Sequence, residues 1–334
     1  MTTREDADVR SVACPRYGGP DVLELRDVPI PVPTDGEVLV RVHAAGLNAA
    51  DWHVMRADPA IVRLGQGLRR PKIKALGSDI AGTVHTLGRG VHGLAVADEV
   101  LGELSASGCG AFAEYVCVPQ KFIAAKPVHL SFEEAAVLPV SGITALQALR
   151  DQAMLRAGET VLVHGASGGV GPYAVQLAVA MGGQVTAVCS AAKIDGIRAL
   201  GAAEVVDYGV DDVFAGGRQW DVILGVNGFQ ALTRYRDALK PGGRYLMIGG
   251  TGKQMFQGIV SGRFRSRGGR TLGYVVATPD AEKLATVAGY AHSGQLRPHI
   301  DRTFALEEYE EAMRYLEDGH SHGKSVFSIY GGDS

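Results

Sequence analysis

The first third of the chain contains short apolar segments in which hydrophobic and polar residues alternate. Residues 37–43, 80–85 and 113–118 are examples, and Gly, Pro and Asp residues separate them. Such alternation is typical of strands with one buried face, and the interrupting residues are typical of turns. The pattern from about residue 11 to residue 127 therefore predicts a compact, β-rich domain.

After residue 131 the pattern changes to strands that alternate with helices. Helical segments such as 172–181, whose apolar residues recur on one face, separate six strand candidates. The strand candidates are residues 161–163, 185–189, 204–207, 222–224, 245–248 and 272–276. This alternation predicts βαβ units and hence an α/β fold with a doubly wound parallel sheet.

The tail from Leu296 adds an extended segment, a helix near residues 306–316 and a final strand at 325–329. We expect this tail to return to the β-rich domain, which leaves the α/β domain inserted between two parts of the first. The predicted boundaries are 1–127 for the β-rich domain, 128–294 for the α/β domain and 295–334 for the returning segment.

Composition narrows the class of protein. The 334 residues suffice for about two domains, and 46% of them are hydrophobic, which provides material for a core. A net charge of -3 disfavours a nucleic-acid partner. The four cysteines form no Cys-x-x-Cys pair, so neither a zinc ribbon nor a disulfide framework is indicated. Without a secretory signal or a membrane-spanning apolar run, we expect a cytoplasmic protein with no membrane partner.

The strongest local motif is a glycine-rich turn between the first α/β strand and the helix that follows it. Residues 161–171 read Val-Leu-Val-His-Gly-Ala-Ser-Gly-Gly-Val-Gly. Glycines allow close approach of a pyrophosphate, and the helix N-terminus offers N–H groups to the anion. The Gly-x-Gly-x-x-Gly pattern is imperfect, because Ala166 stands in the first place before Gly168 and Gly171.

The same segment also satisfies Gly-x-Ser-x-Gly, the nucleophile elbow of α/β-hydrolases. That hypothesis needs an acid and a late histidine, for which Asp280 with His292 or His299 could be nominated. It leaves Gly171 and the β-rich domain unexplained, so dinucleotide binding is the favoured interpretation.

The end of the second strand discriminates between the two nicotinamide dinucleotides. NAD sites place Asp or Glu there for the ribose hydroxyls, whereas this strand ends in Ser190. Lys193 follows with a positive charge, and Tyr208 ends the next strand with a hydroxyl. Three donors predict NADPH, although Lys193 and Tyr208 are also ordinary surface residues.

Several ordered motifs resemble one protein family over nearly the whole length. They are residues 46–51, 76–82, 110–115, 138–145, 199–202, 206–208, 241–244 and 320–324, together with the glycine loop. The chain resembles the zinc-free quinone oxidoreductase (zeta-crystallin-like) branch of the medium-chain dehydrogenase/reductase superfamily. Residues 50–56 and 317–320 are most similar to the group that includes reticulon-interacting mitochondrial reductases.

The resemblance implies a GroES-like catalytic domain, a Rossmann domain and a cleft between them that holds NADPH. It also implies hydride transfer to a small-molecule quinone or α,β-unsaturated carbonyl compound by a homodimer. In zinc-bearing alcohol dehydrogenases, a Cys follows the early Gly-Leu and a His occupies the Gly-His-Glu motif. Asn48 and Ser78 stand in those places, so we expect no zinc.

Carried over by position, Ser167, Gly168, Gly169, Val170 and Gly171 would hold the pyrophosphate. Thr144, Gly249 and Gly250 would lie at the nicotinamide, and Lys324 would lie near the cofactor. Asn227 is displaced by one place from the family pattern, which puts its cofactor contact in question.

Without a metal, hydrogen-bond donors must stabilise charge on the acceptor oxygen. Asn48 is the candidate for binding the carbonyl, His53 for delivering a proton and Asp51 for orienting both. His53 stands where several quinone reductases have Tyr. Asn48 and Asp51 could instead hydrogen-bond their own loop, and His53 could only line the pocket. A non-catalytic NADPH-binding protein is the alternative from another class, and NADPH consumption with quinones or enones separates the two.

Overall fold

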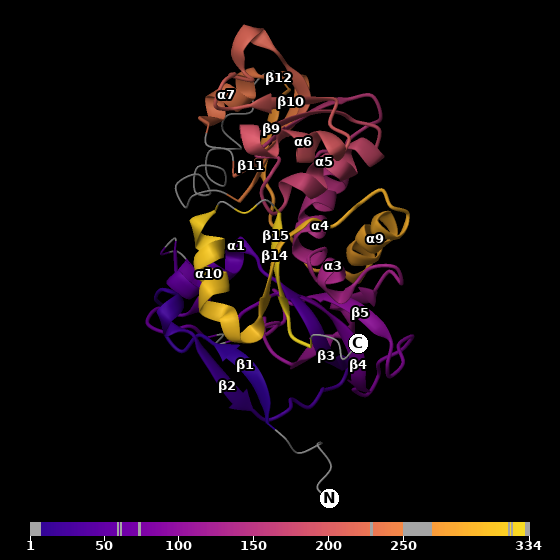
Figure 1. Ribbon diagram of the computed structural model, residues 1–334. Coiled ribbons are helices and arrows are strands. Elements are labelled where there is room, and N and C mark those ends of the chain that lie inside the picture. Colours follow the sequence, from indigo (N-terminus) through magenta and orange to yellow (C-terminus); the bar gives the residue numbers. More distant parts are fainter. Residues whose placement is uncertain are drawn as a thin grey trace, which may run out of the picture. The chain divides into compact units, whose positions relative to one another are not determined.

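A computed structural model describes residues 8–58, 60, 62–72, 75–227, 230–249, 269–319, 321 and 323–330 (Figure 1). The chain forms two compact units. Unit 1 comprises Met1–Val140, Thr278–His292 and Pro298–Ser334, and unit 2 comprises Ser141–Ala277 and Ser293–Arg297.

Unit 1 is built on a largely antiparallel sheet. In the described part of the chain it has seven strands, six of them in the order β14-β15-β3-β4-β5-β7, with β6 paired to β3. These strands are β3 (Glu37–Gly46), β4 (Asp79–Leu87), β5 (Glu99–Glu103), β6 (Tyr115–Pro119), β7 (Ile123–Ala125), β14 (Ile300–Ala305) and β15 (Lys324–Ser328). Because β15 pairs with β3, the C-terminal segment completes a sheet that begins with N-terminal strands.

Smaller elements surround this sheet. They are the antiparallel pair β1 (Val9–Ala13) and β2 (Glu24–Val28), and the helices α1 (Ala49–Arg56), α2 (Val62–Gln66), α3 (Phe132–Ala136), α9 (Ala281–His292) and α10 (Tyr309–Asp318). Local chemistry fixes several helix ends. Ser131 and Glu134 form a capping box at α3, and Gly319 ends α10 in the left-handed conformation.

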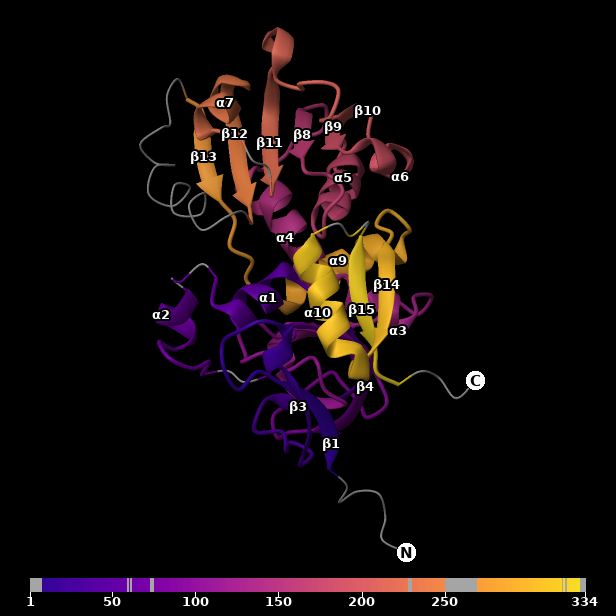
Figure 2. The same ribbon diagram turned by 60° about the vertical axis from the view of Figure 1, so that its left-hand side comes forward.

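Unit 2 contains the doubly wound parallel sheet that the sequence predicts. Six strands of the described residues follow one another in the order β10-β9-β8-β11-β12-β13, and Figure 2 shows them side by side. They are β8 (Thr160–His164), β9 (Gln184–Cys189), β10 (Glu204–Asp207), β11 (Trp220–Val226), β12 (Leu239–Ile248) and β13 (Thr271–Tyr274). Each of the six apolar runs is therefore a strand, and the α/β fold class is confirmed.

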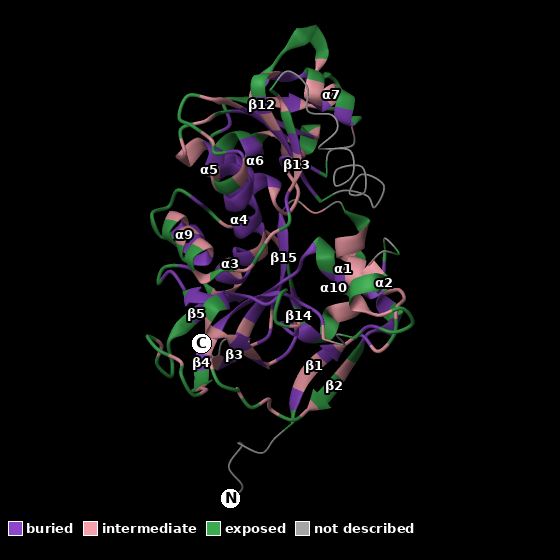
Figure 3. Ribbon diagram, turned by 180° about the vertical axis from the view of Figure 1, so that it is seen from behind, coloured by how far each residue is buried: buried purple, intermediate pink, exposed green. Residues whose placement is uncertain are grey.

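In the described part of unit 2, the longer helices are α4 (Pro139–Leu146), which begins at the end of unit 1, a π-helix (Gln147–Gln152), α5 (Gly171–Ala180), α6 (Ile194–Ala199) and α7 (Leu232–Asp237). Figure 3 shows α4 buried along most of its length, as is β15 of unit 1. All strands of the parallel sheet point the same way, so their carboxyl ends share one edge. In such sheets ligands bind at that edge.

Candidate active site

The loop between β8 and α5 contains glycines with two different roles. Gly165 has a φ of +95°, and a Cβ there would lie 1.9 Å from the carbonyl oxygen of Val226. At Gly171 a Cβ would lie 2.4 Å from the carbonyl carbon of Ala166. Both positions therefore require glycine for packing of the protein itself.

Gly168 differs from these two glycines. A Cβ there would meet no atom within 4 Å, so protein packing does not demand glycine at this position. Helix α5 begins three residues later, at Gly171, and the free amides at the start of a helix favour an anion. A dinucleotide pyrophosphate fits the loop on this ground. The dinucleotide motif pointed to Gly168 but not to Gly165, which stood out only as the first glycine of the Gly-x-Ser-x-Gly pattern.

The ends of β9 and β10 lie next to each other. Cys189 pairs with Asp207, and the Tyr208 amide donates to the Cys189 carbonyl at 3.1 Å. Ser190 and Tyr208 are therefore neighbours, with Ser190 half-buried and Tyr208 exposed. Asp207 adds an acid that the sequence argument did not count, and its carboxylate accepts the Gly209 amide at 2.9 Å.

Lys193 lies in the short turn that follows Ser190, and its amide donates to the Ser190 carbonyl at 2.9 Å. Burial and the Asp207 carboxylate raise the pKa of Cys189, and the Lys193 ammonium partly opposes them. The positive charge thus acts on the same strand end that presents Ser190.

The next two strand ends bring Asn227 and Gly249 together. Asn227 has a φ of +51°, and its amide donates to the Ile248 carbonyl at 3.1 Å. A Cβ on Gly249 would lie 2.6 Å from the Asn227 Oδ1, so the Asn side chain covers this glycine. Thr144 is buried in α4, and Gly250 lies outside the described residues.

In unit 1 the junction of β3 and α1 positions two of the catalytic candidates. Asp51 is buried in the first turn of α1, and its Oδ2 accepts the Asn48 amide at 2.7 Å. This bond is the half of a capping box in which a side chain binds the amide just before the helix. Asp51 thus hydrogen-bonds the backbone of its own loop, which is the contact that the Asx alternative describes.

The side-chain amide of Asn48 is engaged on both sides. Its Oδ1 accepts from the Lys324 ammonium at 2.5 Å, and its Nδ2 donates to Asp79 Oδ2 at 3.0 Å. The Gly46 carbonyl lies 3.5 Å from the same nitrogen. Because both amide functions already have partners, the expected binding of a substrate carbonyl by Asn48 does not fit this structure.

Lys324 is the cation of this cluster. Its ammonium also donates to the Leu47 carbonyl at 2.7 Å and lies 3.8 Å from Asp79. Burial lowers the pKa of Lys324, whereas the carboxylates of Asp79 and Asp51 act in the opposite direction. Lys324 joins β15 to the start of α1 and to β4.

Three buried carboxyl groups accompany this single buried cation. Burial raises the pKa of Asp51 to about 7 and that of Asp79 to about 6, against the lowering effects of Asn48 on both. Burial and the carboxylate of Asp79, its partner across β4 and β5, raise the pKa of Glu103 to about 7. Sequence reasoning missed Asp79 and Glu103 as site residues. The acid in the family motif at 76–82 was the available signal for Asp79.

His53 lies on α1 but has different neighbours. Its ring stacks on Trp52 with centroids 3.7 Å apart, and its Nδ1 lies 2.5 Å from the Asp58 carbonyl oxygen. A carbonyl oxygen can only accept, so Nδ1 carries the hydrogen and Nε2 is the nitrogen that can exchange a proton.

The described residues give no support to a metal site, a membrane span or a hydrolase triad. Within them, no three His, Cys, Asp or Glu side chains are grouped so as to hold a metal ion. No helix in that part of the chain combines the length and hydrophobicity that crossing a membrane requires. Asp280, the acid nominated for a hydrolase, caps α9 by accepting the Lys283 amide at 3.0 Å.

A GroES-like unit, a Rossmann sheet and a dinucleotide loop define a nicotinamide-dependent oxidoreductase. Residues 34–128 match the alcohol dehydrogenase GroES-like domain, and residues 200–327 match the zinc-binding dehydrogenase domain. The chain is 33% identical over 92% of its length to the chloroplast envelope quinone oxidoreductase homolog of Arabidopsis thaliana, covering 94% of that protein. It is 32% identical to the 2-methylene-furan-3-one reductase of Solanum lycopersicum, over 93% of this chain and 76% of the relative.

Solved structures agree. The quinone oxidoreductase from Coxiella burnetii superposes with a TM-score of 0.85 at 30% identity, over 97% of this chain and all of the other. A mycobacterial protein in complex with NADPH gives a TM-score of 0.79 at 26% identity, over 96% of this chain and 100% of that one. The protein belongs to the medium-chain dehydrogenase/reductase superfamily, among the quinone oxidoreductases.

Proposed function

We propose that the protein uses NADPH, without a metal ion, to reduce quinones or α,β-unsaturated carbonyl compounds. The observation that carries the cofactor assignment is the open space over Gly168, between two glycines that packing requires. Relatives named as quinone and furanone reductases support the acceptor class, and the NADPH complex of a similar structure supports the cofactor.

The cofactor residues follow from the carboxyl edge of the parallel sheet. Ser167, Gly168, Gly169, Val170 and Gly171 are proposed to bind the pyrophosphate, and Ser190, Lys193 and Tyr208 the 2′-phosphate. Thr144, Asn227 and Gly249 are proposed for the nicotinamide side. When bound, NADPH supplies the hydride, and the chain supplies orientation and charge.

On the acceptor side we assign the proton to His53 and a positioning role to Asn48. Reduction leaves negative charge on the acceptor oxygen, and a neighbouring acid lowers that cost by donating a proton. The hydrogen bond from Nδ1 to Asp58 fixes the imidazole, so a protonated Nε2 is the donor. Asp51 and Lys324 hold the Asn48 backbone and side chain and thereby fix the start of α1.

The proposal is tested by NADPH consumption, followed at the nicotinamide absorbance, with a panel of quinones, enones and simple aldehydes. We expect turnover with quinones or enones and a lower kcat for His53→Ala. Tyr309→Ala, which removes a ring packed on the core of unit 1, is the control. NADPH binding without turnover of any acceptor would assign the protein to the non-catalytic class instead.

A further inference from the structure

In unit 1, hydrogen bonds hold the segment from α2 to Lys72 in one conformation. The Gly67 amide donates to the Arg63 carbonyl at 2.8 Å, and the Lys72 amide donates to the Gln66 carbonyl at 2.5 Å. The Tyr17 hydroxyl donates to the Gly67 carbonyl at 2.7 Å, which ties the loop to the body of the unit. These bonds fix which side chains the loop presents to solvent.

Two leucines are among the side chains presented. Leu64 is 70% exposed and Leu68 is 68% exposed, although leucine is a residue that folding normally buries. They are four residues apart, and Gly67 separates them with a φ of +117°, where a Cβ would lie 2.3 Å from the Arg70 carbonyl oxygen. The backbone bonds around this turn thus hold both leucines outward.

The segment is basic, whereas the whole chain has a net negative charge. The chain has a net charge of -3, but residues 59–78 contain five basic residues and no acidic one. Arg69, Arg70 and Lys72 are exposed, as is Arg63, whose guanidinium lies 5.1 Å from the centre of the Tyr17 ring. Exposed leucines flanked by cations match the surface of a membrane that contains anionic lipids.

We propose that the loop at residues 62–72 docks the protein peripherally on membranes rich in anionic lipids. The leucines enter the headgroup boundary, and the cations contact lipid phosphates. This revises the expectation that membranes play no part, and it requires no spanning helix. It rests on the proposed function in one respect only: quinones with long apolar tails reside in membranes, where a docked reductase would meet them.

The experiment is co-sedimentation of the purified full chain with phosphatidylcholine vesicles, with and without phosphatidylglycerol. We expect binding only when phosphatidylglycerol is present, and release by added salt. Arg69→Glu with Arg70→Glu should weaken binding at least about 30-fold, because each cation near the surface contributes ~1 kcal/mol. Leu64→Ser with Leu68→Ser should weaken it about tenfold through lost apolar burial.

Matched controls separate this surface from general electrostatics. Arg89→Glu with Lys121→Glu makes the same change in net charge at exposed positions elsewhere in unit 1, and Val32→Ser with Val96→Ser removes two exposed apolar side chains. Both should bind like the wild type. Equal losses in test and control variants, or no binding to anionic vesicles, would overturn the proposal.

Turnover of a short-chain, water-soluble quinone distinguishes this proposal from the proposed function. We expect its kcat to be unchanged in the loop variants. Vesicle binding without any turnover would contradict the reductase and leave docking standing. Turnover without vesicle binding would contradict docking and leave the reductase standing. If the loop variants instead show a raised KM for the soluble quinone and bind vesicles normally, the loop contacts substrate and docking is overturned.

Discussion

At the scale of single residues, we propose that Ser190 and Lys193 set the preference for NADPH over NADH. The 2′-phosphate adds about -1.5 to -2 charges at neutral pH, so its site needs cations and hydroxyls. A hydrogen bond to a charged group contributes roughly 1.5–3 kcal/mol. We therefore expect Lys193→Ala to weaken NADPH binding by about ten- to a hundredfold and to leave NADH binding nearly unchanged. Ser190→Asp should add repulsion and shift the preference toward NADH.

The measurement is the dissociation constant of each dinucleotide for the wild type and both variants. Arg198→Ala is the matched control, because it removes another cation of unit 2, an exposed one that is paired with Asp195. The phosphate assignment is wrong if the wild type binds NADH as tightly as NADPH, or if Lys193→Ala weakens both equally.

Glu103 gives the buried cluster a measurable pH dependence. Its pKa is raised to about 7 in the folded protein, so between roughly pH 4.5 and pH 7 the folded state binds more protons than the unfolded state. Its contribution to stability is therefore complete below the unfolded pKa and is lost as the pH rises through 7. Glu103→Gln cannot ionise and keeps an acceptor for the Ser105 amide.

We expect the free energy of unfolding of Glu103→Gln, relative to the wild type, to rise by about 1–3 kcal/mol between pH 5 and pH 8.5. Urea denaturation across that range measures it, with the exposed Glu282→Gln as the charge-matched control. If the difference in the free energy of unfolding between Glu103→Gln and the wild type stays constant with pH, the pKa of Glu103 is not raised.

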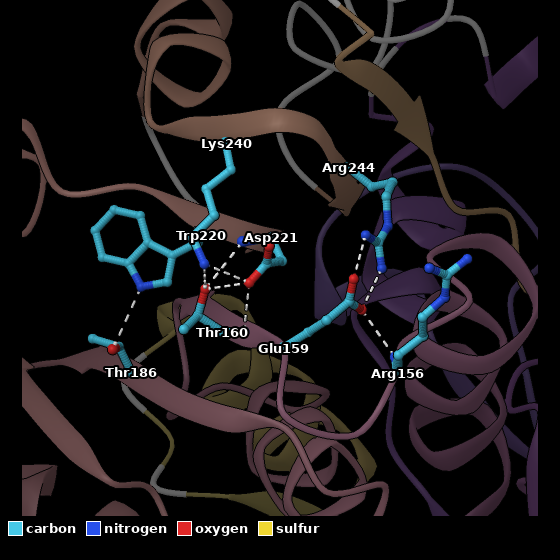
Figure 4. A network of polar contacts seen from close by, with 8 residues as sticks. All are labelled: Arg156, Glu159, Thr160, Thr186, Trp220, Asp221, Lys240 and Arg244. Atoms are coloured by element: carbon cyan, nitrogen blue, oxygen red, sulfur yellow. Dashed lines mark hydrogen bonds and ion pairs between the residues drawn. The ribbon is translucent and has the colours of Figure 1, made fainter.

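At the scale of elements, the two ends of the strands in the parallel sheet have different roles. The carboxyl ends carry the dinucleotide loop, whereas the amino ends are joined by polar contacts (Figure 4). Asp221 of β11 accepts from the Thr160 amide at 2.8 Å, the Thr160 hydroxyl at 2.7 Å and the Lys240 ammonium at 2.7 Å. Beside them, Arg244 holds Glu159 through two bonds of 2.8 and 2.6 Å.

This separation predicts that Asp221→Asn destabilises the protein without impairing the site. Loss of charge-assisted bonds at a mostly buried carboxylate should lower the free energy of unfolding by about 1–3 kcal/mol. Glu204→Gln, which breaks an exposed pair with Arg218, should cost under ~1 kcal/mol. Urea titration checks both, while NADPH affinity should match the wild type. A large change in that affinity would mean that the amino edge also shapes the site.

Elements were easier to predict from the sequence than the contacts between them. The six strands of unit 2 could be predicted because buried parallel strands are continuous apolar runs. Helix α9 was not predicted, although Asp280 before it is a typical cap. The bond between Lys324 and Asn48 joins residues 276 positions apart, and the pairing of Asp79 with Glu103 depends on strand register. Neither contact produces a periodic pattern of residues that could be recognised in a single sequence.

The whole molecule should work without zinc. Asn48 and Ser78 supply no thiolate or imidazole, and the Lys324 ammonium already places a cation beside Asn48 and Asp79. A second cation there would meet repulsion in a buried environment. We expect purified protein to contain far less than one zinc per chain and to keep its activity in a chelator. Metal analysis and activity with and without chelator check this, and one tightly bound zinc per chain would contradict it.

The last prediction concerns assembly. Strand β13 is at an edge of the six-stranded sheet in the described part of the chain, paired to β12 on one side. Two residues beyond it, Val276 is 61% exposed. The unpaired backbone groups of an edge strand are a template for pairing with another strand. We propose that two copies join through β13 and extend the sheet across a homodimer.

Sedimentation at micromolar concentration should give a dimer for the wild type. Val276→Lys places a charge next to the proposed contact and should weaken the dimer by at least about tenfold, because charged side chains block strand pairing. Val32→Lys puts the same charge on an exposed valine of unit 1, and it should leave the dimer intact. A monomeric wild type, or equal weakening by both lysines, would remove β13 as the interface. A dimer that survives Val276→Lys would place the contact on another surface of the chain.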